Sequence, residues 1–307
     1  MGHDTNSAAV PEFRYDVWAH SVAFSRDSRY VAVLAMSDHL ILWDVVAKRE
    51  AATQDFAFSG EGQIEFSPDG KTVCVTSAGS ARWFEMPSLR LLKEEPADRL
   101  VLAQDGGFAM LARQGQIIRR DYPSGVETSL GSSAIMGYKA TAALSPDGQT
   151  FVIGGEEGKV ALWHTRHPGP PTMLEGHNKA LIIRVAFSPD GKWIASASWD
   201  GTIGLWQPNG RNIRFLRGHN GAVWGVAFSR DGRTLASGAN DGTIKLWNLA
   251  SMQEAATLHG HDGPVSVVAF SPNGSLLASA AEGVLRLWKA PAFEELSAAE
   301  RMIEAKK

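Results

Sequence analysis

Histidine, serine and aspartate recur together in this chain, at a spacing that is nearly the same in two successive segments. Such a trio can activate the serine as a nucleophile for acyl transfer, with the histidine as general base. The two sets are His177, Ser196 and Asp200, and His219, Ser237 and Asp241. A catalytic nucleophile needs no second copy in the following segment, so the repetition favours a structural role for both sets.

The sequence offers little other chemistry. It has no P-loop, no Gly-x-Ser-x-Gly elbow, no dinucleotide-binding glycine pattern and no His-Glu-x-x-His. His164 and His167 lie just before a proline-rich stretch, and two imidazoles without a nearby carboxylate or thiolate are typical of a solvated loop. We therefore predict no catalytic residue, no metal site and no cofactor.

Composition narrows the choice of partners and compartment. Lys and Arg total 30 against 33 Asp and Glu, a formal charge of −3, without a basic stripe. A nucleic acid or an anionic membrane is therefore not expected as partner. Cys74 is the single cysteine, which excludes an intramolecular disulfide and any multi-cysteine metal site. With no secretory signal and no apolar run that could span a bilayer, we predict a cytoplasmic protein.

An internal repeat organises the chain. The segments 185–191, 226–232 and 268–274 are near copies of Val-Ala-Phe-Ser-Pro-Asp-Gly. Their last residues belong to a series spaced roughly 40 residues apart: Ser28, Gly70, Gly106, Gly148, Gly191, Gly232 and Gly274. A second series runs in step with the first: Trp43, Trp83, Arg119, Trp163, Trp206, Trp247 and Trp288. Two markers with one period predict seven units.

Each unit has the pattern of short strands joined by tight turns. In the sixth unit, Asp231-Gly232 and Asp241-Gly242 are hairpin turns between β-prone runs. The expected strands are 223–229, 233–240, 243–248 and 252–258. No room remains for a crossover helix, so each unit should be a four-stranded antiparallel sheet. Because such a sheet is apolar on both faces, seven of them must stack around a ring. The prediction is an all-β, seven-bladed propeller in one domain, residues 1–290, followed by a tail, residues 291–307.

The repeat resembles that of WD40-repeat propellers over residues 13–289. The shared signature is a Gly-His pair, a Phe-Ser-Pro-Asp-Gly turn, Asp-Gly-Thr-Ile and a closing Trp, nearly complete in units five to seven. The resemblance implies a hydrogen-bonded tetrad inside a blade. The residues concerned are His177, Ser196, Asp200 and Trp206; His219, Ser237, Asp241 and Trp247; and His261, Ser279 and Trp288, with Glu282 in place of the aspartate. Residues 287–296 resemble the endings of bacterial members.

The resemblance also implies how the ring closes. Family members usually borrow an outer strand from the N-terminus, for which Ala8 to Phe13 is the candidate, although Pro11 lacks a hydrogen-bond donor. The tail, residues 291–307, is an alternative source of that strand in its first part, or else a docked helix.

Partner-binding positions follow from the same resemblance. Family members often bind peptides at the mouth of the central channel. The residues used are those before the second turn and those opening the innermost strand: here Trp199, Asn240 and Glu156, and Ile183, Trp224 and Ser266. Trp199 and Trp224 lie outside the repeating Trp series, so we expect them at the centre of a protein or peptide site. The alternative is that they plug the channel.

We therefore predict a monomeric, non-catalytic scaffold or sensor module that binds a protein or peptide on the rim of the propeller. Two other functions stay open at this point. One is an enzyme with its active site at the channel mouth, where Glu156, Glu157 and Asp200 are the acidic candidates. The other is a regulatory domain of a larger signalling assembly.

Overall fold

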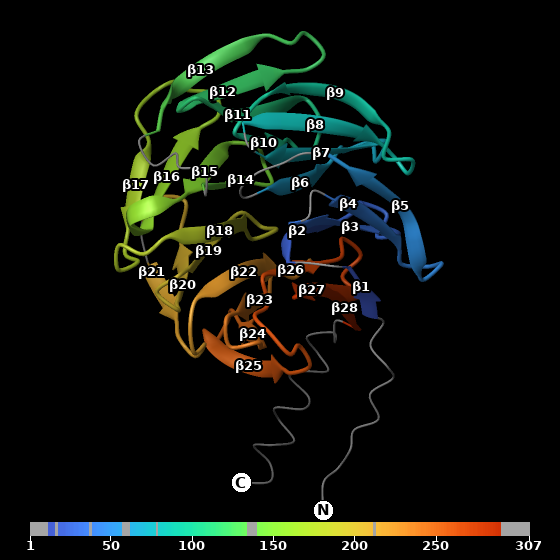
Figure 1. Ribbon diagram of the computed structural model, residues 1–307. Helices are drawn as coiled ribbons and strands as arrows, with labels where there is room; N and C mark the ends of the chain where they lie inside the picture. The colour runs from blue at the N-terminus through green and yellow to red at the C-terminus, as the bar shows by residue number, and fades with distance from the viewer. Residues whose placement is uncertain are drawn as a thin grey trace, which may run out of the picture.

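The computed structural model describes residues 12–15, 18–36, 39–56, 62–77, 79–133, 140–210 and 213–289. Within these residues the strands form seven four-stranded antiparallel sheets around a central axis (Figure 1). The predicted all-β, seven-bladed propeller is confirmed. The described residues include no α-helix and one short 3-10 turn, η1 (Glu156–Gly158).

Sheets one to six each use four consecutive strands, in order from the axis outward. The first three sheets are β2 (Ala19–Phe24), β3 (Tyr30–Ala35), β4 (His39–Asp44), β5 (Arg49–Asp55); β6 (Gln63–Phe66), β7 (Thr72–Ser77), β8 (Ser80–Glu85), β9 (Leu91–Pro96); and β10 (Arg99–Leu102), β11 (Phe108–Arg113), β12 (Gln116–Asp121), β13 (Glu127–Ser132). The next three are β14 (Thr141–Leu144), β15 (Thr150–Gly154), β16 (Lys159–His164), β17 (Thr172–Glu175); β18 (Ile182–Phe187), β19 (Ile194–Ser198), β20 (Ile203–Trp206), β21 (Ile213–Leu216); and β22 (Val223–Phe228), β23 (Thr234–Ala239), β24 (Ile244–Asn248), β25 (Gln253–Leu258).

The seventh sheet closes the ring with the N-terminal strand. Its order is β1 (Glu12–Arg14), β28 (Val284–Lys289), β27 (Leu276–Ala281) and β26 (Val267–Phe270). Within the described residues the closing strand is Glu12–Arg14, which overlaps the last two residues of the predicted segment 8–13, whereas residues 1–11 lie outside the described part of the chain. The tail, residues 291–307, also lies outside it. Because β1 occupies the edge of β28, the outer strand there does not come from the tail.

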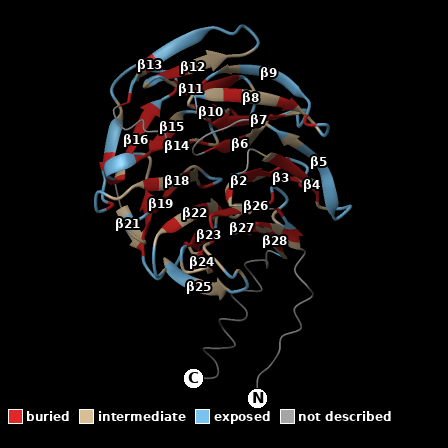
Figure 2. Cartoon of the chain, viewed as in Figure 1, coloured by how far each residue is buried: buried red, intermediate tan, exposed pale blue. Residues whose placement is uncertain are grey.

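The core lies between neighbouring sheets, where the inner three strands of each sheet are covered. Figure 2 shows this as buried inner strands surrounded by exposed outer strands such as β5 and β9. The second strands of the fifth and sixth sheets carry small residues where the next sheet approaches closely. A Cβ at Gly238, for example, would lie 2.6 Å from a methyl carbon of Val265. This close approach explains the Ala-Ser-Gly run of β23.

Two members of the predicted series, Trp83 and Arg119, lie one residue out of register with the others. Trp247 pairs with Leu235, the second residue of its neighbouring strand. The residue that pairs with the second residue of the neighbouring strand is Phe84 in sheet two, opposite Val73. In sheet three it is Arg120, opposite Ala109. Trp83 and Arg119 each lie one residue earlier. Since side chains alternate along a strand, they point to the opposite face of their sheets. The count of seven units is unaffected.

Candidate functional site

The fifth sheet brings His177, Ser196, Asp200 and Trp206 together. The Trp206 indole N–H donates to Ser196 Oγ at 2.7 Å, and Ser196 Oγ lies 2.7 Å from His177 Nε2. His177 Nδ1 lies 2.9 Å from the Asp200 carboxylate, which also accepts from the Thr202 hydroxyl at 2.6 Å. Burial lowers the pKa of His177, against the pull of Asp200, so the ring is neutral near pH 7. The consistent direction of donation is Trp206 to Ser196 to His177 to Asp200.

The sixth sheet repeats this arrangement. The Trp247 indole donates to Ser237 Oγ at 2.8 Å, His219 Nε2 lies 2.7 Å from the same oxygen, and His219 Nδ1 lies 3.0 Å from Asp241. The pKa of Asp241 falls to about 2: burial raises it, but hydrogen bonds from Thr243 and from the backbone outweigh burial.

The seventh sheet keeps only part of the arrangement. His261 Nε2 and the Trp288 indole both lie 2.7 Å from Ser279 Oγ. In the described residues no carboxylate is hydrogen-bonded to His261, because Glu282 in the aspartate position lies against Gly263 instead. Burial, and next the charge of Arg286, lower the pKa of His261 to about 4.

These sets have the donor order of a catalytic triad but lack an accessible nucleophile. Ser196 and Ser237 are both 0% exposed, and an indole N–H already occupies each hydroxyl oxygen. A substrate carbonyl therefore has no approach to either oxygen in this conformation. The geometry fits a lock on each of these two blades, since it ties together two strands, the turn between them and the loop that enters the sheet.

The rim that carries Asp200 and Asp241 is called the upper rim here. Three backbone hydrogen bonds place the residues before these turns at equivalent positions in different sheets: Trp199 N to Leu181 O, Asn240 N to Ala222 O, and Met36 N to Trp18 O. Met36 is thus the first-sheet counterpart of Trp199 and Asn240. It is 54% exposed, which makes it one of the most exposed large apolar side chains described.

Three tryptophans from different sheets meet at the upper rim. The ring centroids of Trp199 and Trp224 are 5.9 Å apart with planes at 69°, and those of Trp224 and Trp18 are 6.0 Å apart at 68°. Trp199 is 45% exposed, whereas Trp224 is half-buried. Trp224 therefore lies across the channel mouth, as the plug interpretation expects, and Trp199 lies open to solvent, as a binding surface requires.

A cavity of about 190 Å³ lies beside these rings. Three predicted positions line it, namely Trp224, Ile183 and Ser266. Trp199, Asn240 and Glu156 are exposed on the same rim but are not among its lining residues. Sequence reasoning missed its other walls: Trp18, Ala19, His20, Met36 and Arg184. His20 occupies the same position on its innermost strand as Trp224 and Ser266 on theirs. Aligning the degenerate first unit with the other units would therefore have predicted it.

Two charged side chains lie inside the channel: Arg184, which lines this cavity, and Glu65, which lines the cavity at the opposite end. The Arg184 guanidinium reaches from β18 to the carbonyl oxygen of His20 on β2, at 2.8 Å. Glu65 on β6 accepts from Gln63 Nε2 at 2.8 Å. Burial raises the pKa of Glu65 to about 7, although Gln63 and Arg184 both pull the pKa down.

The acidic residues considered for catalysis do not converge. Glu157 is paired with Lys159 at 2.6 Å, Asp200 belongs to the fifth-sheet tetrad, and neither they nor Glu156 line the upper cavity. The described residues contain no cluster of three potential metal ligands. In the described part of the chain no helix is long and apolar enough to cross a membrane.

Comparison with known proteins identifies the repeat. The family model described as "WD domain, G-beta repeat" matches residues 169–207, 210–248 and 252–289, which lie in sheets four to seven. A Notchless protein homolog of Arabidopsis thaliana is 38% identical over 104 residues, 33% of this chain and 21% of that protein.

Two further relatives align more weakly. Apoptotic protease-activating factor 1 of Rattus norvegicus is 25% identical over 200 residues, 63% of this chain and 16% of that protein. Polyadenylation factor subunit 2 of Candida albicans is 26% identical over 94 residues, 31% of this chain and 17% of that protein. The matched region thus spans about a fifth or less of each relative. Three segments between residues 169 and 289 thus match the WD domain, G-beta repeat, and they lie in a chain whose described residues form a ring of seven four-stranded sheets.

Proposed function

We propose that this propeller is a non-catalytic module that binds a protein or peptide on its upper rim. The observation that carries the proposal is the contact of Trp18, Trp224 and Trp199 across three sheets at the channel mouth. Tryptophan is enriched at the centres of protein interfaces, because it offers a large, rigid apolar surface. Exposed Met36 extends this surface on the first sheet.

The rim also offers a hydrogen-bond donor. The indole nitrogen of Trp224 is buried and meets no acceptor among the described residues. An unsatisfied buried donor costs about 1–3 kcal/mol. Because this nitrogen has almost no accessible surface, a carbonyl oxygen of a bound peptide would remove that cost only after the Trp224 ring turns outward. This favours a partner that presents backbone beside an apolar side chain.

The proposal also concerns the compartment in which the module works and the assembly to which it belongs. The buried thiol of Cys74 has a pKa raised well above its ordinary value, mainly by burial, so it is protonated and unreactive. Such a thiol suits the cytoplasm, where we place the protein as a monomer. The relatives are several times longer than the matched region, and one is named as a subunit. This supports a role as one domain or subunit of an assembly.

The test is affinity capture from the source cell with the full chain as bait. The variant Trp199→Ala with Trp224→Ala should recover at least roughly tenfold less of the partner, because hot-spot residues each contribute about 2 kcal/mol or more. Met173→Ala is the matched control. It removes a side chain of similar exposure, 41% against 45%, from the outer strand β17.

Equal capture by the double variant, with an unchanged circular dichroism spectrum, would refute the upper-rim site. Loss of capture in the Met173→Ala control as well would show that the partner binds the outer surface instead. Turnover of a substrate that depends on Glu156 would contradict the non-catalytic assignment.

A further inference from the structure

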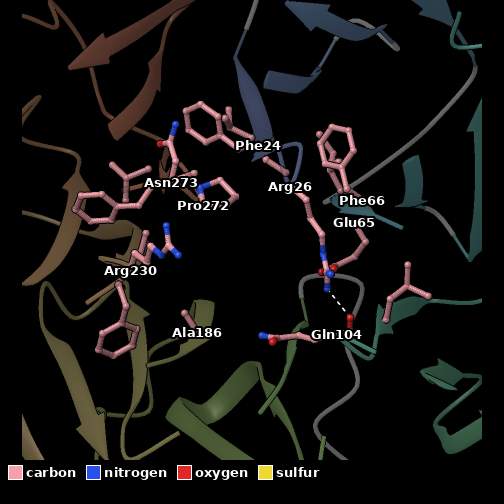
Figure 3. A pocket seen from close by; sticks show the side chains of 18 of the residues that line it. Phe24, Arg26, Glu65, Phe66, Gln104, Ala186, Arg230, Pro272 and Asn273 are labelled. Atoms are coloured by element: carbon pink, nitrogen blue, oxygen red, sulfur yellow. Dashed lines mark hydrogen bonds between the residues drawn. The ribbon is translucent and has the colours of Figure 1, made fainter. Parts of the chain in front are cut away.

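The turns around the upper rim carry charge of one sign. These are the second turns, which join the second and third strands of each sheet. Their described residues include no Lys and no Arg, and their carboxylates are Glu156, Glu157, Asp200, Asp241 and Glu282. At the opposite end of the channel both signs occur, since Arg26, Arg230 and Glu65 all line the cavity there (Figure 3). The two ends of the channel therefore differ in charge.

The carboxylates of the upper rim differ in whether they already have a partner. Asp200 and Asp241 each accept from a histidine of their own sheet and from the threonine of their own turn. Glu157 is paired with a lysine. Glu156 and Glu282 are exposed and make no ion pair within the described residues. These two side chains are therefore open to a cation from a partner.

The two open carboxylates flank the tryptophans. Glu156 in sheet four is the counterpart of Trp199 in sheet five, because the carbonyl oxygens just before Glu156 and Asn240 accept equivalent backbone hydrogen bonds. Glu282 lies in the second turn of sheet seven, which follows the sheet that carries Trp224. The aromatic contact thus has a carboxylate in the sheet on either side of it.

The cations near the tryptophans do not neutralise these flanks. Lys159 holds Glu157 at 2.6 Å, and this hydrogen bond and, more weakly, the charge of Lys179 lower the pKa of Glu157. Arg184 donates to a backbone carbonyl of β2 at 2.8 Å, and the Arg217 guanidinium lies over an aromatic ring of the outer strand β21. The histidines of the upper loops add no charge near pH 7, because burial lowers the pKa of His177, His219 and His261.

We infer, on the basis of the upper-rim function proposed above, that the partner presents a basic segment. An apolar side chain of this segment packs on Trp199, and lysine or arginine side chains on either side of it lie toward Glu156 and Glu282. Charges of opposite sign across an interface speed association and select among partners. An acidic or phosphorylated segment would instead meet like charges on both sides of the tryptophans.

Binding of three labelled peptides to the full chain, measured by fluorescence anisotropy, tests this inference. The peptides share a central leucine, flanked on each side by two lysines, two glutamines or two glutamates. The basic peptide should bind roughly tenfold or more tightly than the acidic one. Glu156→Gln with Glu282→Gln should weaken binding of the basic peptide about fivefold, as expected for two exposed ion pairs. The same pair of changes should leave the affinity for the glutamine peptide unaltered.

Glu50→Gln with Glu94→Gln is the matched control, because it makes the same change of net charge at exposed positions on the outer strands β5 and β9. It should leave all three affinities unaltered. Equal affinity of the wild type for the basic and acidic peptides, an absence of binding included, would overturn the inference. So would equal affinity for the basic peptide in the wild type and the rim variant, or equal weakening by the rim and control variants. The upper-rim function would still stand in those cases if Trp199→Ala with Trp224→Ala lost the cellular partner, so the two failures are distinguishable.

Discussion

At the scale of single residues, the same three side chains that make a nucleophile elsewhere make a structural lock here. What differs is access: in Ser196 the hydroxyl oxygen accepts from an indole and the residue is fully buried. The neutral His177 accepts a hydrogen bond from the Ser196 hydroxyl at Nε2 and donates one from Nδ1 to Asp200. The lock works because each polar group satisfies the next, in a place where an unpaired group would be costly.

Removing the Ser196 hydroxyl should destabilise the protein without affecting any reaction. Ser196→Ala leaves the Trp206 N–H and His177 Nε2 without their partner, so we expect the free energy of unfolding to fall by about 2 kcal/mol. Urea unfolding followed by tryptophan fluorescence measures this. Ser275→Ala on an exposed turn is the control and should change the free energy by less than about 0.5 kcal/mol. Unchanged stability in Ser196→Ala would show that the lock contributes nothing.

At the scale of elements, turn chemistry made the blades predictable. Asp-Gly turns need a left-handed residue, and Gly232 and Gly242 have φ of 68° and 75°. Ser28 adopts φ 60° in the degenerate first unit, so that turn survives without its glycine. The first unit lacks the Gly-His pair and the Asp-Gly of the second turn, and the contribution of His20 and its neighbours to the upper rim was therefore not predicted. Spacing alone also could not determine on which face Trp83 lies, because a shift of one residue reverses the face.

The closing strand β1 is difficult to predict from the sequence, because it has only three described residues. In the described part of the chain Glu12–Arg14 cover the outer edge of β28, and Phe13 among them is buried in the cluster between sheets seven and one. Its ring centroid lies 4.5 Å from that of Trp43. The contact joins the first and last parts of the chain. The local sequence around Phe13 or around Trp43 does not indicate the contact, because the contact forms only when the ring of sheets closes.

Shortening Phe13 should open the ring. We expect Phe13→Ala to lower the free energy of unfolding by about 3 kcal/mol, as for other buried Phe to Ala changes. Amide exchange of β28 should become faster, because its outer edge loses a partner strand. Arg14→Ala, on the same strand but exposed, should do neither. Normal β28 protection in Phe13→Ala would mean that another segment covers this edge.

At the scale of the whole molecule, repetition turns one local pKa shift into a global pH response. Burial is the main cause that lowers the pKa of His177, His219 and His261 below the ordinary 6.5. The unfolded chain therefore takes up protons at a higher pH than the native chain. It follows that stability is lost as pH falls below about 6.5. Glu65 acts in the opposite direction, because its raised pKa lets the native state hold a proton that the unfolded chain has released.

The two kinds of group can be separated by their effect on the slope of stability against pH. Between about pH 7 and about pH 4.5, wild-type stability should decrease with acidity, since three histidines outweigh one glutamate. His261→Gln should flatten this decline, because the residue with a native pKa of about 4 no longer takes up a proton on unfolding. Glu65→Gln should steepen it, because a carboxyl group with a raised pKa, which favours the native state in acid, is gone. Urea unfolding at a series of pH values gives the slopes. A wild-type slope of zero over this window, or equal slopes in the two variants, would contradict the assignment of the response to these buried groups.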